Sequence, residues 1–213
     1  MKGMLMLIKK ILLVVLFMTI LSTSEVSNNL VNASNGPSAS MIFTEEEFQF
    51  QIKSKDIAIK IGNTREEVEQ QLGHPVDYYY HTNVYQYKNM RIHYKAGIVD
   101  GIMIDDLAIF RKYKTPRGIG FGSTIQEVIQ QYGKKAFIDS NQRKVSSITY
   151  VMERNKQGDY SVISSFDKFV LEGGYENLMG LSMVLDQRGR VSFLMIADYE
   201  FAYHPEFRWT ETQ

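Results

Sequence analysis

The stretch Ile59-Lys-Ile-Gly-Asn-Thr-Arg-Glu-Glu-Val-Glu-Gln-Gln-Leu-Gly73 decides the fold, because the chain contains it twice. Sixty residues later the sequence reads Ile119-Gly-Phe-Gly-Ser-Thr-Ile-Gln-Glu-Val-Ile-Gln-Gln-Tyr-Gly133. Seven of the twelve positions from Gly62 to Gly73 are identical to their counterparts in the second copy, without a gap. A repeat at a fixed period indicates that one supersecondary unit has been duplicated.

Each copy predicts a short helix with a capped start and a glycine after its end. A threonine followed three residues later by a glutamate has the spacing of a capping box. A glycine after the last turn closes a helix at low cost, because it accepts a positive φ. We interpret the glutamates as structural caps rather than catalytic acids. The predicted caps are Thr64, Glu67, Gly73, Thr124, Glu127 and Gly133.

Short alternating runs with turn residues between them follow each helix and predict strands. In the first copy these runs are 77–80, 84–87, 90–95 and 98–104. The second copy ends with the runs 181–185 and 191–199, and a hairpin of 146–154 with 160–166 precedes them. The sequence therefore predicts an α+β fold of two tandem units, each a short helix packed on its own antiparallel β-meander.

The N-terminus has the pattern of a secretory signal peptide. Lys2, Lys9 and Lys10 precede an apolar run of eleven residues at 11–21, which is too short to span a bilayer. We expect residues 1–33 to be removed, and an uncleaved anchor is the alternative. The predicted organisation is a signal peptide at 1–33, a flexible mature start at 34–44, the repeats at 45–113 and 114–200, and a tail at 201–213.

Composition excludes several classes of function. The 24 basic and 24 acidic residues give a formal net charge of +0, so no basic field is present to hold nucleic acid. The chain has no cysteine, which excludes disulfides, thiolate metal sites, cysteine nucleophiles and a lipid-modified N-terminal cysteine. No membrane contact is expected unless the N-terminal segment stays uncleaved.

The pattern Ile-x-x-Gly-x-Thr-x-x-Glu-Val-x-x-x-Leu-Gly-x-Pro, from Ile59 to Pro75, resembles the SmpA/OmlA and β-lactamase-inhibitory-protein-like group of secreted bacterial proteins. Secreted Gram-positive domains that accompany CAP proteins share a similar pattern. The second copy departs from it, with Tyr132 for the leucine and Lys134 and Lys135 where the proline would follow. The resemblance implies a non-enzymatic protein, and tandem copies are more similar to the inhibitor, which presents an aromatic sheet face to a protein partner.

The sequence offers only weak support for a metal, phosphate or catalytic site. His81 and His93 would lie on neighbouring strands, where Asp100 or Asp105 could join them at a metal, but no helical histidine pair supports this. The glycines of 117–124 superficially resemble a phosphate loop, yet the first copy has one glycine in the same place and the lysine of a P-loop is absent. We therefore expect no catalytic residue, no metal and no cofactor, with a small extracellular hydrolase or metal-dependent enzyme as the alternative.

Tyrosines form the most suggestive surface. Tyrosine is enriched where proteins meet, because its ring gives large and rigid contact area. It also simply favours strands, so a structural role is the alternative. The predicted partner-binding residues are Tyr78, Tyr79, Tyr80, Tyr85, Tyr87, Tyr150, Tyr160 and Phe193.

We expect a secreted or envelope-associated, non-enzymatic protein-binding module, either an inhibitor or an assembly factor. A membrane-tethered stress or immunity protein is the alternative if the N-terminal segment is retained.

Overall fold

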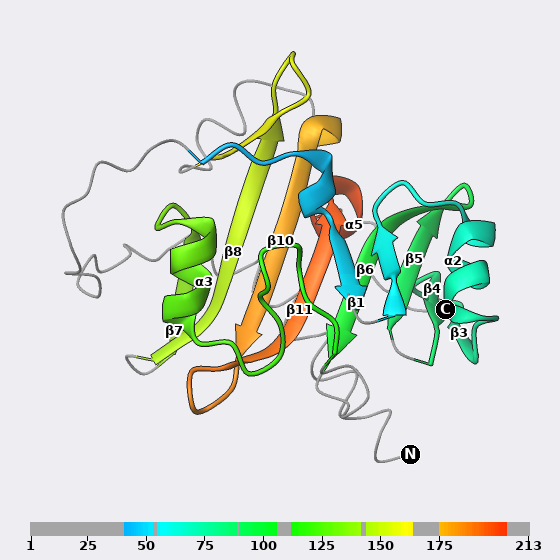
Figure 1. Cartoon of the computed structure of the whole chain (residues 1–213), viewed down its shortest axis with the longest axis horizontal. Coiled ribbons are helices and arrows are strands. Elements are labelled where there is room, and N and C mark those ends of the chain that lie inside the picture. Colours follow the sequence, from blue (N-terminus) through cyan, green and yellow to red (C-terminus); the bar gives the residue numbers. More distant parts are fainter. Residues whose placement is uncertain are drawn as a thin grey trace, which may run out of the picture. The chain divides into compact units, whose positions relative to one another are not determined.

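Both copies of the repeat form a capped helix in the computed structural model, which describes residues 41–52, 55–88, 90–105, 112–141, 144–163 and 175–203 (Figure 1). Helix α2 spans Arg65–Leu72 and helix α3 spans Ile125–Tyr132. The Thr64 hydroxyl accepts the Glu67 amide at 3.2 Å, and the Glu67 carboxylate accepts the Thr64 amide at 2.8 Å. The same capping box closes the start of α3, and the C-terminal glycines have φ of 78° and 87°. The predicted caps are present.

Antiparallel strands make up most of the remaining described chain. The first part contains the 3-10 helix η2 (Glu45–Glu47) and the strands β1 (Gln49–Ile52), β2 (Ile57–Lys60), β3 (Asp77–Tyr79), β4 (Val84–Gln86), β5 (Arg91–Lys95) and β6 (Ile98–Asp105). The second part contains β7 (Phe137–Asn141), β8 (Lys144–Arg154), β9 (Tyr160–Val162), the 3-10 helix η4 (Tyr175–Asn177), β10 (Leu178–Leu185), β11 (Val191–Asp198) and helix α5 (Tyr199–Tyr203).

The strands that follow the two helices belong to one sheet, in the order β3-β4-β5-β6-β11-β10-β8-β7, with β9 paired to β8. β6 pairs with β11, and Ile102 lies opposite Ile196. The predicted α+β fold of two separate helix-on-meander units is therefore wrong. The described protein is mostly β, with one large antiparallel sheet and three short α-helices.

The physical reason for this correction is burial on both faces of the central strands. Leu194, Met195, Ile196 and Ala197 are consecutive in β11 and all buried, although alternate residues face opposite sides of a sheet. A meander ending at β6 or β11 would leave such a strand as an exposed apolar edge, which invites aggregation. Pairing the two strands with each other removes both edges.

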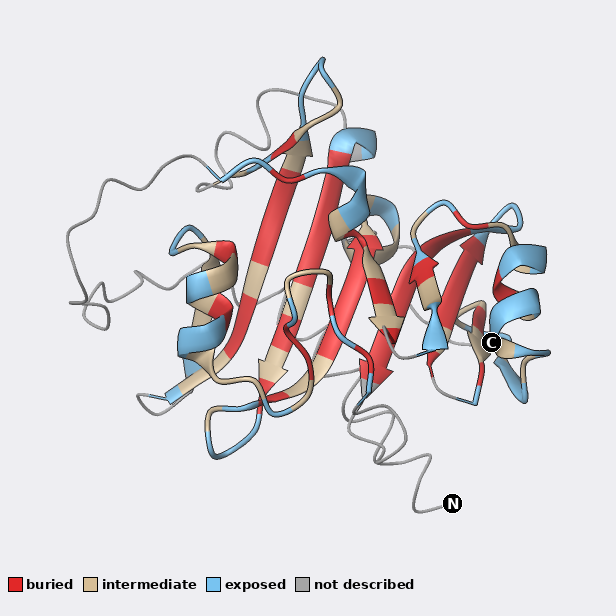
Figure 2. Ribbon diagram, viewed as in Figure 1, coloured by how far each residue is buried: buried red, intermediate tan, exposed pale blue. Residues whose placement is uncertain are grey.

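One face of the sheet carries the main core, beneath α2, α3 and the β1–β2 hairpin (Figures 1 and 2). Val68 of α2 and Val128 of α3 are both fully buried in it. A single row of side chains crosses the sheet on this face, each lying opposite the next on the neighbouring strand. In order, its members are Tyr78, Tyr85, Ile92, Ile102, Ile196, Leu181 and Tyr150.

The opposite face carries a parallel row with small residues at its centre. Its members are Tyr79, Val84, His93, Gly101, Ala197, Gly180 and Val151. Helix α5 contacts this region of β6, β10 and β11. A Cβ atom added to Gly101 would lie 2.4 Å from the ring of Phe201, so the glycine is required for α5 to approach. Residues 201–203 of the predicted tail are therefore part of a helix.

The chain that enters the first repeat is fixed against the second. Phe43 is fully buried, and its backbone exchanges hydrogen bonds of 3.0 and 2.7 Å with Tyr160 of β9. The Arg117 guanidinium lies 4.4 Å from the Phe43 ring and pairs with Glu47 at 2.8 Å. Residues 41–44 are thus an ordered strap rather than the flexible start that the sequence predicts. The buried Phe43 ring and its backbone hydrogen bonds to Tyr160 fix this segment, and both depend on a distant part of the chain.

The described residues all belong to one compact unit, with both repeats inside it. The predicted signal peptide at 1–33 lies outside the described residues, as do the starts of the predicted mature chain at 34–40 and the end of the tail at 204–213. In the part of the chain that the structure describes, no helix is long and apolar enough to cross a membrane.

Candidate functional site

Three of the tyrosines predicted at a binding surface lie in the core instead. Tyr87 and Tyr150 are fully buried, and Tyr160 is 7% exposed. Each hydroxyl of the first two has an internal partner: Tyr87 lies 2.7 Å from the hydroxyl of Tyr94, and Tyr150 donates to the carbonyl of Gly133 at 2.8 Å. Desolvation by burial raises the pKa of all three. The structure therefore places these three residues in the core and not on an exposed surface.

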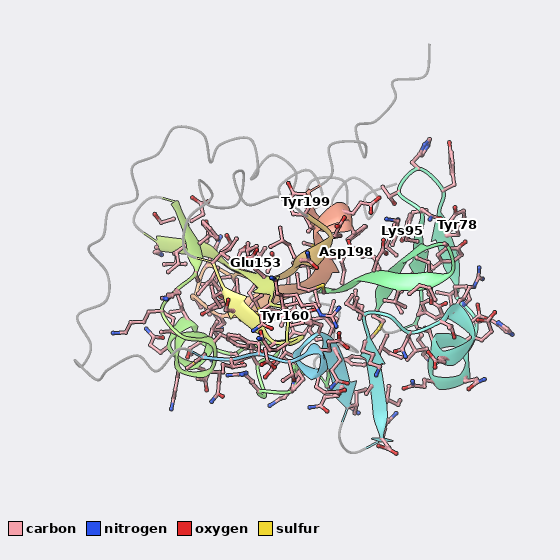
Figure 3. All side chains as sticks on the ribbon, turned by 90° about the horizontal axis from the view of Figure 1, so that it is seen from above. Tyr78, Lys95, Glu153, Tyr160, Asp198 and Tyr199 are labelled. Atoms are coloured by element: carbon pink, nitrogen blue, oxygen red, sulfur yellow. The ribbon has the colours of Figure 1, made fainter. Side chains whose placement is uncertain are left out.

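Two other predicted tyrosines are exposed and lie at one end of the sheet. Val76, Tyr78 and Tyr80 expose 68%, 45% and 70% of their surface. They are three of the six large apolar residues exposed in the described chain, and they take alternate positions within residues 76–80, on and beside the edge strand β3. We call these three residues the aromatic edge. Figure 3 shows Tyr78 at this end of the sheet.

The rings of the aromatic edge are held in place by their neighbours. The Tyr78 ring lies 4.5 Å from that of Tyr85, and its hydroxyl donates to Asn83 at 3.0 Å. Asn83 is in turn fixed by a hydrogen bond from its amide nitrogen to the carbonyl of Tyr94 at 3.0 Å. The Tyr80 ring lies 3.6 Å from the ring of His81. Rings held in this way lose little conformational entropy on binding.

A charged rim borders the aromatic edge on the side of α2. The Arg65 guanidinium lies 4.5 Å above the Tyr85 ring and bonds Glu69 at 2.6 Å. His74 contacts the other carboxylate oxygen of Glu69 at 2.6 Å. The hydrogen bond from Arg65, followed by that of His74, lowers the pKa of Glu69. An apolar centre with charges fixed at its border is the usual composition of a protein-binding surface.

The remaining predicted residues do not join this surface. Tyr85 supports Tyr78 from within and is half-buried. Tyr79 is half-buried and lies opposite Val84, on the other face of the sheet. Phe193 is half-buried on β11, which β4, β5 and β6 separate from β3. The two copies of the repeat therefore do not contribute equivalent aromatic surfaces.

The two histidines considered for metal or hydrolytic chemistry have different neighbours in the structure. His93 and Asp100 are buried and lie 2.5 Å apart, and the Phe201 ring stacks on His93 with 4.5 Å between centroids. His81 belongs to the β3–β4 turn beside Tyr80. Among the residues that the structure describes, no three histidine or acidic side chains are arranged to hold a metal ion.

Further acidic residues surround the His93–Asp100 pair at the start of α5, a cluster that sequence reasoning did not find. Asp198 accepts the Phe201 amide at 2.8 Å, and Glu200 pairs with Lys95 of β5. Figure 3 shows Asp198 and Lys95 in this region. Burial raises the pKa of Asp198, and the charges of Asp100 and Glu200 add to the effect. The cluster fastens α5 to the sheet, and Phe201 covers the histidine.

Comparison with known proteins gives no relative: no family profile, no curated protein and no solved structure matches the chain.

Proposed function

We propose that this chain is a secreted or envelope-associated, non-enzymatic module that binds a protein partner through the aromatic edge. The single observation that carries the proposal is that Val76, Tyr78 and Tyr80 are exposed together. Contacts with Tyr85 and Asn83 hold the Tyr78 ring in place. Large apolar residues gathered at one place on a surface indicate a contact site. We infer that the partner is sequestered or assembled rather than chemically altered.

The resemblance of the repeat to secreted inhibitors and envelope-assembly proteins supports the same function. It rests on Ile59 to Pro75, and it also favours an exported chain. The hydrolase alternative has less support, because the His93 and Asp100 side chains are each only 9% exposed and Phe201 covers the histidine ring.

Site-specific photo-crosslinking tests the proposed contact. A photoreactive residue replaces Tyr80 in one variant and Ile42 in a control, since Ile42 is also exposed, at 62%, but belongs to the strap. Both variants are produced in the native organism, and cross-linked products are identified by mass spectrometry. We expect one protein to be captured from position 80 and not from position 42. Equal capture at both positions, or none at position 80, would contradict the proposal.

Export is tested separately from binding. Mass spectrometry of the culture supernatant and the envelope fraction should find a mature N-terminus between Ser24 and Ser40. The upper limit of this range, Ser40, agrees with a fold that needs Phe43, because cleavage after Phe43 would remove a buried ring. Full-length protein confined to the cytosol would contradict the proposed localisation.

A further inference from the structure

We propose that helix α5 is a pH-sensitive latch, which docks on the sheet more firmly in acid and is released more readily as the pH rises. Figure 3 shows α5 and its residue Tyr199 on the side of the sheet away from α2 and α3. With five residues, Tyr199–Tyr203, α5 is too short to be stable as a helix by itself. Contacts with the sheet must therefore hold it, and several of these contacts are made by ionisable side chains. The latch is separate from the aromatic edge and does not depend on the proposed function.

The Phe201 ring packs directly on Gly101 in the middle of the sheet. A Cβ atom at Gly101 would lie 2.4 Å from this ring, so a larger residue there would push α5 away. His93 of β5 and Ala197 of β11 lie opposite Gly101 on its two sides. The His93 ring stacks on that of Phe201 at an interplanar angle of 26°, and His93 is 7% exposed. Movement of α5 away from the sheet would therefore bring this histidine into contact with water.

Ionisable side chains surround this contact. Asp100 lies 2.5 Å from Nδ1 of His93, and Asp198 accepts the Phe201 amide at 2.8 Å. β10 also contacts α5, but the sequence of this strand has no ionisable residue. The groups that face or flank the helix are His93 and the Lys95–Glu200 ion pair, Asp100 of β6, Asp198 of β11, the exposed Glu176 of η4, and the tyrosines of α5 and η4.

Negative charge is in excess beside the docked helix. The carboxylates of Asp100, Asp198 and Glu200 bring three negative charges, whereas the Lys95 ammonium brings one positive charge. Burial raises the pKa of Asp198, and the other two carboxylates add to this effect, against the Phe201 amide and Lys95. A proton that any of these groups takes up therefore reduces repulsion in the docked state. A proton on His93 would also place a cation against the Phe201 ring, which is favourable.

Proton uptake on docking fixes the direction of the pH dependence. The docked state holds a proton on Asp198 more tightly than an open state, in which this carboxyl returns to solvent. For Asp198, docking therefore weakens as the pH rises from the ordinary aspartate value of about 3.9 to the raised value, and it is constant outside that range. The latch is thus firm in acid and looser at neutral pH.

Hydrogen–deuterium exchange of the mature chain tests the latch, measured by mass spectrometry from about pH 4.5 to about pH 8 and corrected for the intrinsic effect of pH on exchange. We expect the protection of residues 199–203 to fall as the pH rises, by up to about tenfold per pH unit for each proton released. The paired amides of β10 and β11 should keep their protection, which excludes global unfolding. Gly101→Ala should give the low protection of the open state at every pH.

Substitution of the two ionisable groups that contact Phe201 completes the test. His93→Asn with Asp198→Asn keeps a donor for Asp100 and an acceptor for the Phe201 amide, so α5 should dock but lose most of its pH dependence. Asp139→Asn, at a half-buried aspartate of β7 at the other end of the sheet, should behave like the native chain. Circular dichroism confirms that each variant is folded. Protection of α5 that does not fall with rising pH, an unchanged pH dependence in the double variant, or native protection in Gly101→Ala overturns the inference.

Discussion

At the scale of single residues, the helix caps are the part of the structure that the sequence predicts best. A capping box is a local device: Thr64 and Glu67 need only each other and the backbone between them. Burial of the tyrosines was harder to predict, because it depends on distant parts of the chain. Tyr150 is covered by α3, and Tyr160 by the strap, neither of which alternation within a strand can reveal.

Loss of a cap has a predictable cost. Thr64→Ala removes the acceptor for the Glu67 amide and should lower the free energy of unfolding by about 1 kcal/mol. Thr64→Ser keeps a hydroxyl and should recover most of the loss. Chemical denaturation of the two variants beside the native chain measures both effects. Equal stabilities for alanine and serine would show that the cap has no role in stability.

Asp198 provides a pH-dependent prediction. Burial raises its pKa in the folded chain, so the folded state binds this proton more tightly than the unfolded state does. The ionised Asp198 carboxylate therefore lowers the free energy of unfolding at neutral pH. This penalty is lost as the pH falls through the raised pKa of Asp198 in the folded chain. Asp198→Asn, which keeps an acceptor for the Phe201 amide, should raise the melting temperature at pH 7 more than in acid.

Asp198→Ala separates charge from hydrogen bonding in this experiment. It removes the charge and also the acceptor for the Phe201 amide, so it should stabilise less than Asp198→Asn at neutral pH. A gain from Asp198→Asn that does not change with pH would show that the carboxylate is not the cause.

At the scale of elements, the strap shows how a segment that looks featureless in sequence becomes structural. The Phe43 ring packs against Arg117 and Tyr132. The two rings are parallel with 6.0 Å between their centroids, and the Arg117 guanidinium lies 4.4 Å from the Phe43 ring and 5.4 Å from the Tyr132 ring. The elements that surround Phe43 come from three separate regions of the chain. The hairpins after each helix, by contrast, were predictable, because turn residues such as Ala96 and Gly97 mark them and both have positive φ.

Removal of the strap's anchor should destabilise the protein. Phe43→Ala leaves a cavity in the core and should lower the free energy of unfolding by about 3–5 kcal/mol. Ile42→Ala changes an exposed neighbour and should have little effect. A chain that begins at Glu45 should be destabilised like Phe43→Ala. Thermal denaturation of the three proteins checks this, and a stable chain from Glu45 would show that the strap is dispensable.

At the scale of the whole molecule, the sequence reveals the duplication, but it does not reveal that the strands of the two repeats form one sheet. The near-continuous apolar runs of β10 and β11 were the available signal, since such runs are typical of strands buried on both faces. Strand pairing between distant parts of a chain leaves no local pattern. The candidate site was found in part, because Tyr78 and Tyr80 belong to the predicted set and Val76 does not.

A shared sheet and core predict that the two repeats unfold together. The core contains Ile92 and Ile102 from the first repeat beside Leu181 and Ile196 from the second. Calorimetry of the mature chain should show one transition whose calorimetric and van't Hoff enthalpies agree. Residues 45–113 produced alone should not fold, because the edge of β6 would be exposed. Two separate transitions, or a folded isolated repeat, would contradict this view.

The pairing of β6 with β11 also governs the order of events during synthesis. Ile102 of β6 cannot pair with Ile196 of β11 until the ribosome has synthesised about 90 further residues. Contacts between residues so distant in sequence slow folding. Until the last strand arrives, β6 is an apolar strand without its neighbour, prone to pair with the wrong chain. A nascent chain of this kind stays unfolded for a long time after β6 is synthesised, which is compatible with the export proposed above.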